Sequence, residues 1–184
     1  MTNTRTSKEK ENNCCPEFDP KPWDDRMLEW DKKRFIKRKV RTFFYIPLNF
    51  SAVMKQLDRK LTQSGVTIPD GLSLSDHTSK WNMDIYIAVD KEVEKEWHVE
   101  FKGKYYCKVY EGPYKDTGKW CQDYEARAVA KKLAIIKWFM WYTTCPECAR
   151  KYGKNPVVII CQVEPANDYH GVFTEIVQIG RAHV

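Results

Sequence analysis

The chain contains 184 residues with a formal net charge of +6 at pH 7, and 42% of its residues are hydrophobic. This composition excludes general disorder and is sufficient for one domain with its own core. The sequence has neither a charged leader with an apolar run nor a stretch of about 18 apolar residues, so secretion and membrane spanning are not indicated. Its seven cysteines, an odd number, argue against a disulfide framework. We therefore expect a cytoplasmic protein with reduced thiols or a bound metal.

The N-terminal part is expected to consist of a tail and an arm. Residues 1–13 are polar and lack an apolar anchor, so we interpret them as disordered. Residues 14–39 are interpreted as an extended arm, because their prolines favour extended or turn geometry and aromatic residues such as Trp23 could pack across the domain. The basic run between Arg26 and Arg41 is accompanied by no DNA-reading motif, so nucleic-acid binding is not expected.

Residues 40–90 predict a strand, a helix and two further strands. The stretch "VRTFFYIPLNF" is rich in aromatic and β-branched residues, as strands are. "SAVMKQLDRKLTQSG" follows as a helix, with Ser51 at the N-cap position and Gly65 where a helix would stop. "GLSLSDHTS" and "NMDIYIAVD" then predict two strands joined by a short polar turn.

Residues 98–165 repeat this order. "KYYCKVYEGPY" predicts a strand, "KDTGKWCQDYEARAVAKKL" a helix, and "IIKWFMWYTT" and "PVVIICQVE" two more strands. We therefore expect an α+β domain over residues 40–165, built from duplicated β-α-β-β units that form a mainly antiparallel sheet. Helices would cover one face of this sheet, and the other face would form a ligand cleft. Residues 166–184 form an uncertain tail, whose end "IGRAHV" matches a translated sequencing adapter.

Strand alternation assigns side chains to the two faces, because successive residues point to opposite sides. If Met83 and Ile85 meet the helices, Asp84 and Tyr86 face the cleft. The same reasoning places the odd-numbered residues of the next strand and of the last strand on the face that meets the helices. The cleft would then receive Tyr106, Lys108, Tyr110, Val158, Ile160 and Gln162.

The stretch "TTCPECARKYGKN" places Cys145 and Cys148 at the spacing of a zinc knuckle. Cys14 and Cys15 could complete the ligand set if the arm folds back. Adjacent cysteines are awkward ligands of one tetrahedral ion, so one of them with His77 or a water is an alternative. Redox use is disfavoured because reactive thiolates usually begin a helix, whereas this stretch is interpreted as a hairpin connection. Zinc is thus the candidate metal, and no other cofactor is indicated.

A resemblance to a known family starts at "YCKVYEGPYKDTGKW". A strand running into Gly112-Pro113-Tyr114 and then a helix, inside a duplicated strand-helix-strand-strand unit, resembles the GyrI-like small-molecule-binding superfamily. This superfamily also supplies the effector domains of multidrug-responsive transcription regulators. The stretches "CCPEFDPKPW" and "TTCPECARKYGKN" are similar to an uncharacterised branch that is loosely labelled as hydrolases. The resemblance covers about residues 40–164.

The resemblance implies a cleft near the pseudo-twofold axis, where aromatic side chains and an acidic group hold apolar, often cationic compounds. The acidic group common in the superfamily has no clean match on the last strand, and Asp84 or Glu111 could substitute for it. A subset of the superfamily hydrolyses strained, reactive xenobiotics in an aromatic cage. For that chemistry a carboxylate or imidazole would activate water, and the candidates here are Glu111, Asp84 and His77. The alternative role of His77 is that of an ordinary turn residue.

Three functional hypotheses follow. The first is a stand-alone protein, without a DNA-binding region, that binds small apolar or aromatic compounds in an aromatic-lined cleft. The second is a hydrolase that acts on a reactive small molecule in the same cleft, and the third is a zinc-stabilised interaction module. The oligomeric state is not indicated. The expected ligand contacts are Tyr86, Tyr106, Tyr110, Tyr114, Trp23 and Gln162.

Overall fold

The computed structural model describes residues 15–166, so the expectations for residues 1–13, Cys14 and residues 167–184 lie outside the described residues. The elements in chain order are β1 (Arg26–Phe43), β2 (Ile46–Pro47), α1 (Phe50–Gln63), the 3-10 turn η1 (Pro69–Gly71), β3 (Ser73–Asp76), β4 (Asn82–Ala88), β5 (His98–Glu111), the 3-10 turn η2 (Tyr114–Asp116), α2 (Thr117–Ala130), β6 (Leu133–Tyr142), α3 (Pro146–Tyr152) and β7 (Pro156–Pro165). None of the helices within residues 15–166 is long and apolar enough to cross a membrane.

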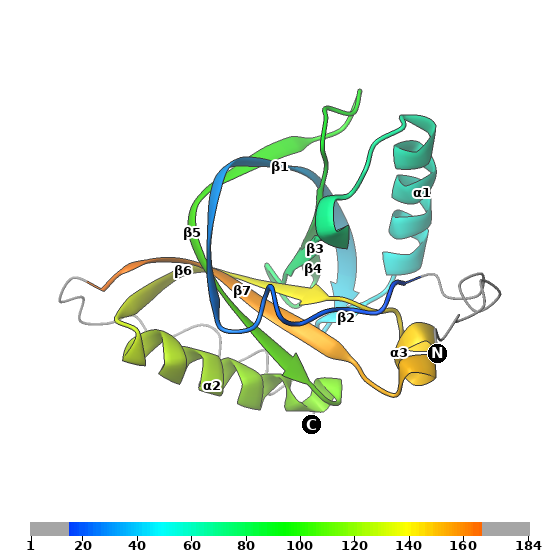
Figure 1. Cartoon of the computed structure of the whole chain (residues 1–184). Coiled ribbons are helices and arrows are strands. Elements are labelled where there is room, and N and C mark those ends of the chain that lie inside the picture. The colour runs from blue at the N-terminus through cyan, green and yellow to red at the C-terminus, as the bar shows by residue number, and fades with distance from the viewer. Residues whose placement is uncertain (1–14, 167–184) are drawn as a thin grey trace, which may run out of the picture.

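The strands form one antiparallel sheet that closes on itself. Within the described residues the strand order is β2-β1-β4-β3-β6-β7-β5, and β5 pairs with β7 on one side and with β1 on the other. Because the pairing of β5 with β1 closes the row of strands from β1 to β5, the sheet becomes a barrel with β2 at its margin. Figure 1 shows β1 and β5 curving around together to make this closure. The resulting sheet has an inner face and an outer face.

The predicted α+β fold is confirmed. The units β1-α1-β3-β4 and β5-α2-β6-β7 repeat the same order of elements. Apolar side chains of α1, such as Leu57 and Leu61, pack on the outer face of β1 and β4. Those of α2, such as Tyr124, pack on the outer face of β5, β6 and β7. Both long helices therefore cover the same face, as expected from the repeat.

The first strand is much longer than its sequence suggested. It was expected from Val40, but β1 begins at Arg26, so a large part of the segment interpreted as an arm is sheet. Charged residues are poor predictors of a strand, and here the backbone is held by pairing with β4 on one side and β5 on the other. The extent of the domain itself stays a prediction. The arm outside the sheet is limited to residues 15–25 among those described.

Two helix predictions need correction. The helix α1 begins at Phe50 with Asn49 at its N-cap position, rather than with Ser51 there. The side-chain oxygen of Asn49 accepts a hydrogen bond from the Arg41 N–H group, at 2.8 Å, which ties the helix start to β1. The connection between β6 and β7 was expected to be a hairpin link, but it contains the short helix α3. Pro146 opens this helix and Gly153, with left-handed backbone, ends it.

The core on the inner face is unusually aromatic. The Trp30 ring contacts that of Tyr105 in a tilted arrangement with centroids 4.0 Å apart, and Trp141 contacts Trp23 of the arm at 4.8 Å. Tyr105 and Cys107 therefore point inward, and Tyr106 points outward to α2, opposite to the expectation for β5. Both faces of this strand carry apolar residues, so hydrophobicity could not decide its orientation. For β4 and β7 the expected faces are correct.

The Gly-Pro-Tyr turn after β5 depends on its glycine. Gly112 has a φ of +142°, a backbone conformation that other L-residues rarely adopt, and a Cβ there would lie 3.5 Å from the Trp120 ring. The turn leads directly into η2 and α2, whose side chains cover the outer face of the sheet. The glycine thus fixes the direction in which the second long helix begins.

We expect Gly112→Ala to lower the free energy of unfolding by roughly 1–3 kcal/mol, because the alanine would have to occupy this unfavourable backbone conformation. Chemical denaturation monitored by circular dichroism would measure the loss. Gly71→Asn is the control, since Gly71 has a φ of +64° and open space where a side chain would begin, and asparagine tolerates that left-handed conformation. Equal losses in the two variants would contradict the argument.

Candidate functional site

Charged side chains gather on the inner face where β3 meets β6. Within the described residues the register between these strands consists of one pair, Ser75 with Met140, so the closed sheet is weakest here. On one side of this seam, the Lys37 ammonium lies 2.8 Å from Asp84 Oδ2, and the two side chains are 18% and 7% exposed. Across the seam, the Lys137 ammonium of β6 lies 3.1 Å from Asp76 Oδ2 of β3. One ion pair thus lies beside the seam and a second one bridges it.

Tyr86 lies between the two ion pairs. Its ring centroid is 5.5 Å from the Lys37 ammonium and 5.4 Å from the Lys137 ammonium. On the inner side the same ring contacts Phe101 at 5.1 Å and Phe139 at 5.7 Å. The charged groups therefore stand on an aromatic floor, and ammonium groups near ring faces are a favourable arrangement.

Both lysines of the seam carry a firm positive charge. The hydrogen bond to Asp84 raises the pKa of Lys37 above its usual value, against the opposing effect of burial. Burial works to lower the pKa of Lys137, but the hydrogen bond and negative charge of Asp76 together with the interaction with Tyr86 outweigh this, and the pKa is also raised. Both ammonium groups therefore remain protonated at neutral pH.

One buried oxygen at this place is unsatisfied. Asp84 Oδ2 is occupied by Lys37, while Oδ1 is buried and has no hydrogen-bond partner in the part of the chain that the structure describes. A buried acceptor without a partner costs free energy, so such groups often serve a ligand or a reaction. Asp84 therefore has one oxygen available to accept a proton or a hydrogen bond.

An exposed tryptophan stands beside the Lys37–Asp84 pair. The ring of Trp97 lies 4.7 Å from the Lys37 ammonium, and the residue is 63% exposed. Its backbone carbonyl accepts a hydrogen bond from the Lys37 N–H group. The preceding residue, Glu96, has a fully buried side chain that pairs with Arg38 and Lys60, at 2.7 and 2.5 Å. The backbone that carries Trp97 is thus anchored, although its ring faces solvent.

We call this group of residues the seam site. Asp84 and Tyr86 were expected from strand alternation, and the other members were not. Lys37 belongs to the basic run between Arg26 and Arg41, to which we assigned no site, although it stands two residues from Phe35 and so shares its face of the strand. The remaining members come together because strands that are distant in the sequence pair in a particular register. No local pattern in a single sequence indicates this register. The seam site consists of Lys37, Asp76, Asp84, Tyr86, Trp97 and Lys137.

Other predicted site residues lie outside the seam site. Trp23 is buried in the inner core against Trp141. Gln162 lies opposite Lys137 in the register of β6 and β7, and its amide donates to the backbone of Lys102. Gln162 therefore lies on the inner face as expected, next to one member of the seam site.

The contacts described for three further candidates are with residues other than Asp84. Glu111 is exposed at the end of β5. Tyr114 lies in η2 and its hydroxyl donates to the side chain of Asn155 at 3.3 Å. His77 follows β3, with its ring 6.3 Å from that of Tyr45. Their expected roles in catalysis and ligand binding stay predictions.

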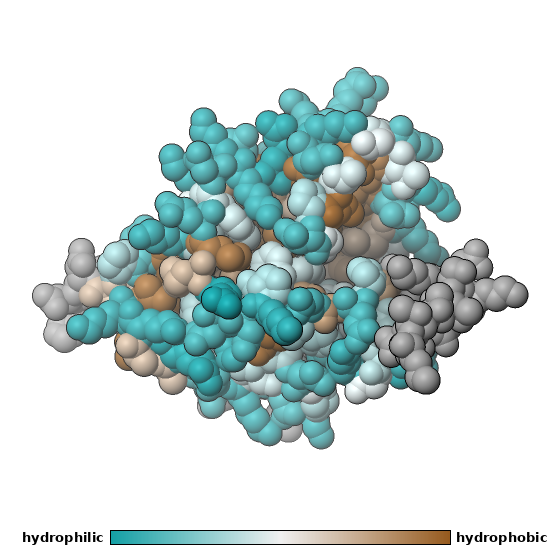
Figure 2. Space-filling view, in the orientation of Figure 1, coloured by the Kyte–Doolittle hydropathy of each residue, from teal (hydrophilic) through white to brown (hydrophobic). Residues whose placement is uncertain are grey.

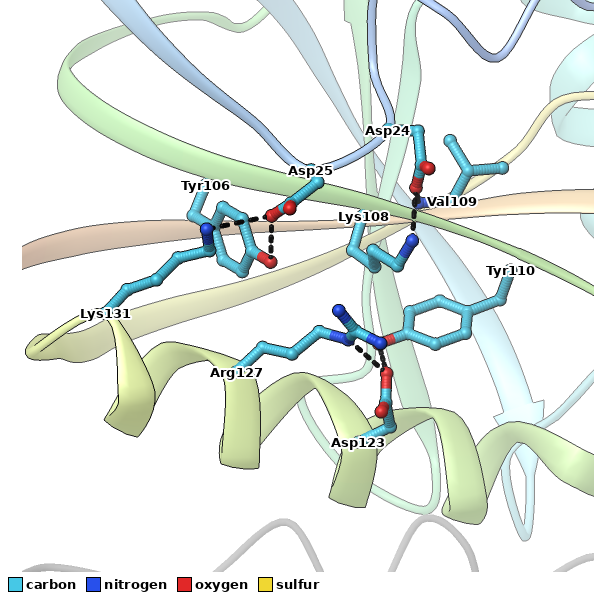
Figure 3. A network of polar contacts seen from close by, with 9 residues as sticks. All are labelled: Asp24, Asp25, Tyr106, Lys108, Val109, Tyr110, Asp123, Arg127 and Lys131. Atoms are coloured by element: carbon cyan, nitrogen blue, oxygen red, sulfur yellow. Dashed lines mark hydrogen bonds and ion pairs between the residues drawn. The ribbon is translucent and has the colours of Figure 1, made fainter.

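Tyr106 and Tyr110 lie on the outer face, in a polar network between the arm, β5 and α2 (Figure 3). The Tyr106 hydroxyl donates to Asp25 Oδ1 at 2.7 Å, and Lys131 lies 3.1 Å from the same oxygen. The Tyr110 hydroxyl donates to Asp123 Oδ2 at 2.8 Å. Both tyrosines therefore lie on the face opposite to the one on which the cleft was expected.

The same network fastens the arm to the sheet. Asp24 Oδ1 accepts hydrogen bonds from the Lys108 ammonium at 2.6 Å and from the Val109 N–H group at 3.1 Å (Figure 3). Hydrogen bonding from Tyr106, followed by that from Lys131, lowers the pKa of Asp25. Burial is the main cause that raises the pKa of Tyr106. These contacts stabilise the turn that carries Trp23 into the inner core.

The three cysteines expected from the zinc hypothesis do meet. The Sγ atoms of Cys15, Cys145 and Cys148 all lie within 4.8 Å of one another, so they could hold a metal ion. Cys14 lies outside the described residues, and His77 is not part of this cluster. Our reason for disfavouring redox use was wrong in its premise, because Cys145 occupies the N-cap of α3 rather than a helix-free hairpin.

A shallow hollow of about 390 Å³ lies where α2 runs into β6. Figure 2 shows apolar surface at this end of the molecule among hydrophilic side chains. Its charged groups include Lys104, Lys131 and Glu164, but it lacks the buried ion pair and the aromatic floor of the seam site. The seam site is therefore the better candidate for chemistry.

Comparison with known protein families gives a match over most of the chain. The family model described as "Bacterial hydrolase" matches residues 5–163. No curated protein matches the chain.

Solved structures support the same fold. The C-terminal domain of EcmrR is 9% identical, with 78% of this chain and 98% of that chain covered and a TM-score of 0.58. A hydrolase from Listeria innocua is 12% identical, with 77% and 93% covered and a TM-score of 0.54. EcmrR in a complex with DNA is 11% identical, with 76% and 57% covered and a TM-score of 0.56. Together with the family model, these neighbours fit a GyrI-like fold.

The outer network predicts a pH dependence of stability. Because the pKa of Asp25 is lowered in the folded protein, its ionised form contributes stability above the usual value of 3.8, and this contribution is lost as the pH falls through the folded pKa. Asp25→Asn should therefore be less stable at neutral pH and lose less stability on acidification. The side chain is 45% exposed, so we expect a difference of no more than about 1 kcal/mol.

Urea denaturation at a series of pH values would measure this difference. The matched control is Asp31→Asn, since the Asp31 side chain is 82% exposed and lies 3.8 Å from its partner Lys102. It should retain the wild-type pH dependence. A wild-type acid profile in Asp25→Asn would show that this carboxylate does not contribute.

Proposed function

Because this chain belongs to the bacterial hydrolase family, we propose that it takes up a small, largely apolar or aromatic compound at the seam site. The observation that carries the proposal is the buried Lys37–Asp84 pair beside the exposed ring of Trp97. Small-molecule sites commonly combine an aromatic or apolar lining with a few convergent polar groups. The seam site has this composition, since Tyr86 and its aromatic neighbours form its floor.

The charges of the seam site favour a ligand without a strong net charge. Two lysines are balanced by two aspartates across the seam. A cationic compound would meet the two ammonium groups as well as the carboxylates, so this arrangement offers less preference for cations than an isolated carboxylate in an aromatic cage. We therefore favour neutral aromatic compounds that can donate a hydrogen bond to Asp84 Oδ1. The aromatic ring of such a compound would stack on Trp97.

The proposal also covers the branch of the superfamily, the cellular compartment and the absence of nucleic-acid binding. It is a GyrI-like protein of the branch marked by "CCPEFDP", and it acts in the cytoplasm without binding nucleic acid. Support comes from the two cysteine-containing stretches and from the absence of a DNA-reading motif in the sequence. The EcmrR structure in a complex with DNA concerns that protein, of whose length this chain covers 57%.

A second candidate function is hydrolysis of the bound compound. Two observations favour it, namely the family description and the buried, unsatisfied Asp84 Oδ1. In this reaction Asp84 Oδ1 accepts a proton from water as the water oxygen attacks the substrate. Lys37 holds the other carboxylate oxygen and so orients the base. Lys137 stands on the opposite side of Tyr86, where its ammonium group stabilises negative charge that develops on the leaving group.

We expect Trp97→Ala to weaken binding of neutral aromatic compounds roughly tenfold, because the stacking surface at the mouth of the site is lost, equivalent to about 1.4 kcal/mol. Isothermal titration calorimetry against a compound panel would measure the affinity. Trp81→Ala is a matched control, since Trp81 is 53% exposed and its ring contacts those of Phe43 and Phe44 instead. No saturable binding by the folded wild type, or equal losses in both variants, would refute the seam site as the ligand site.

Turnover of a bound compound would be tested with Asp84→Asn. We expect a loss of about 10²–10⁴-fold in kcat with a much smaller change in KM, because the variant removes the proton acceptor but keeps its shape. Asp31→Asn, at an exposed position, serves as control. The rival candidates are separated by Glu111→Gln and His77→Asn. Unchanged kcat in Asp84→Asn would overturn this assignment, and a loss in either rival variant alone would move the base to that residue.

A further inference from the structure

We propose that Cys15, Cys145 and Cys148 bind a structural zinc ion that fastens the N-terminal arm to the connection between β6 and β7. This inference is independent of the proposed function, because it concerns neither the seam site nor its ligand. It rests on the meeting of three thiols from segments that are far apart in the sequence. The other cysteines of the described residues, Cys107, Cys121 and Cys161, are instead distributed through the buried cores.

The distances suit a tetrahedral ion. All three Sγ atoms lie within 4.8 Å of one another. A zinc ion with Zn–S bonds of about 2.3 Å would hold pairs of sulfur atoms about 3.8 Å apart. The cluster would therefore contract by about 1 Å at most, which small rotations of cysteine side chains can provide. Three sulfur atoms that surround one point fit an ion better than a disulfide, which joins only two.

The local backbone of α3 presents its two cysteines together. Cys145 is the N-cap and Cys148 lies one turn later, so their side chains meet on one side of the helix start. The Cys148 N–H group donates to Cys145 Sγ at 3.4 Å, and the Cys145 N–H group donates to Cys15 Sγ at 3.3 Å. These two hydrogen bonds hold the three sulfur-bearing residues together at the start of α3.

Independent contacts deliver Cys15 to this place. The Tyr152 hydroxyl donates to the backbone carbonyl of Cys15 at 2.5 Å, and the Lys154 ammonium lies 2.6 Å from Glu17 Oε1. Phe18 packs edge-on against Trp141 with centroids 5.4 Å apart. The arm is therefore already positioned along α3 and the inner core, and an ion at its start would fix it by bonds stronger than these exposed contacts.

A tetrahedral zinc ion needs one ligand in addition to the three cysteines of the cluster. Structural zinc takes four ligands, whereas the cluster supplies three thiolates. Cys14 is the sequence neighbour of Cys15 and lies outside the described residues. The three described thiolates therefore leave one position of a tetrahedral ion to a fourth ligand, which the experiment below identifies.

Metal content of the full chain tests the proposal. Protein purified under reducing conditions should contain about one zinc ion per chain by plasma mass spectrometry. Each of Cys15→Ser, Cys145→Ser and Cys148→Ser should lower zinc affinity at least tenfold, the lower range for lost site residues. Cys121→Ala is the control at a buried cysteine outside the cluster. Cys14→Ser identifies the fourth ligand, since it weakens binding if Cys14 is that ligand and leaves it unchanged if water is.

A second measurement uses the wild-type protein, so that the proposal can still be tested if the cysteine variants fail to fold. Cobalt added to metal-free wild-type protein should give the strong thiolate-to-cobalt absorption of a tetrahedral sulfur site, and zinc should displace it. Chelation of the metal should lower the melting temperature and increase proteolysis of the arm. Wild-type protein without stoichiometric zinc and without this absorption, zinc retained in Cys15→Ser and Cys148→Ser, or thiol titration showing a Cys145–Cys148 disulfide in place of the metal would each overturn the proposal.

Discussion

The pairing of β1 with β5 is the constraint on which the rest of the structure depends. It joins the two repeats along their outer strands and turns an open sheet into a closed one. The inner face is then enclosed, so apolar side chains there pack as a core, and every charge that enters it needs a partner. The ion pairs Lys37–Asp84 and Lys137–Asp76 meet this requirement. Both ion pairs therefore lie on the face for which the ligand cleft was predicted.

The arm completes the enclosure from the N-terminal side. Its contacts lie at both of its ends, with Cys15 and Glu17 held at α3 and with Asp24 and Asp25 held at β5 and α2. Between these ends Trp23 enters the inner core. Single exposed ion pairs contribute little each, but attachment at two ends leaves the segment between them few alternative paths. The aromatic inner core is therefore covered by a segment that the sheet itself does not supply.

The sequence allowed prediction of those features that are encoded locally. The repeated order of elements and the buried faces of α1 and α2 followed from hydrophobic spacing, and alternation placed Asp84 and Tyr86 correctly. The orientation of β5 did not follow, because both of its faces are apolar. Lys37, Trp97 and Lys137 were missed because their grouping depends on register between distant strands. The cysteine ligand types could be proposed from spacing, but the approach of Cys15 to Cys145 required the fold.

The single register pair between Ser75 and Met140 has a thermodynamic consequence for the whole domain. Local opening of a folded protein proceeds where the fewest backbone hydrogen bonds must break. Among the strand contacts of residues 15–166 that place is the junction of β3 and β6, whereas the long ladder of β1 with β5 acts as the fixed edge. Transient opening of the native state would thus separate the two repeats as a hinged pair, exposing Tyr86 and the aromatic floor while the remaining ladders stay intact.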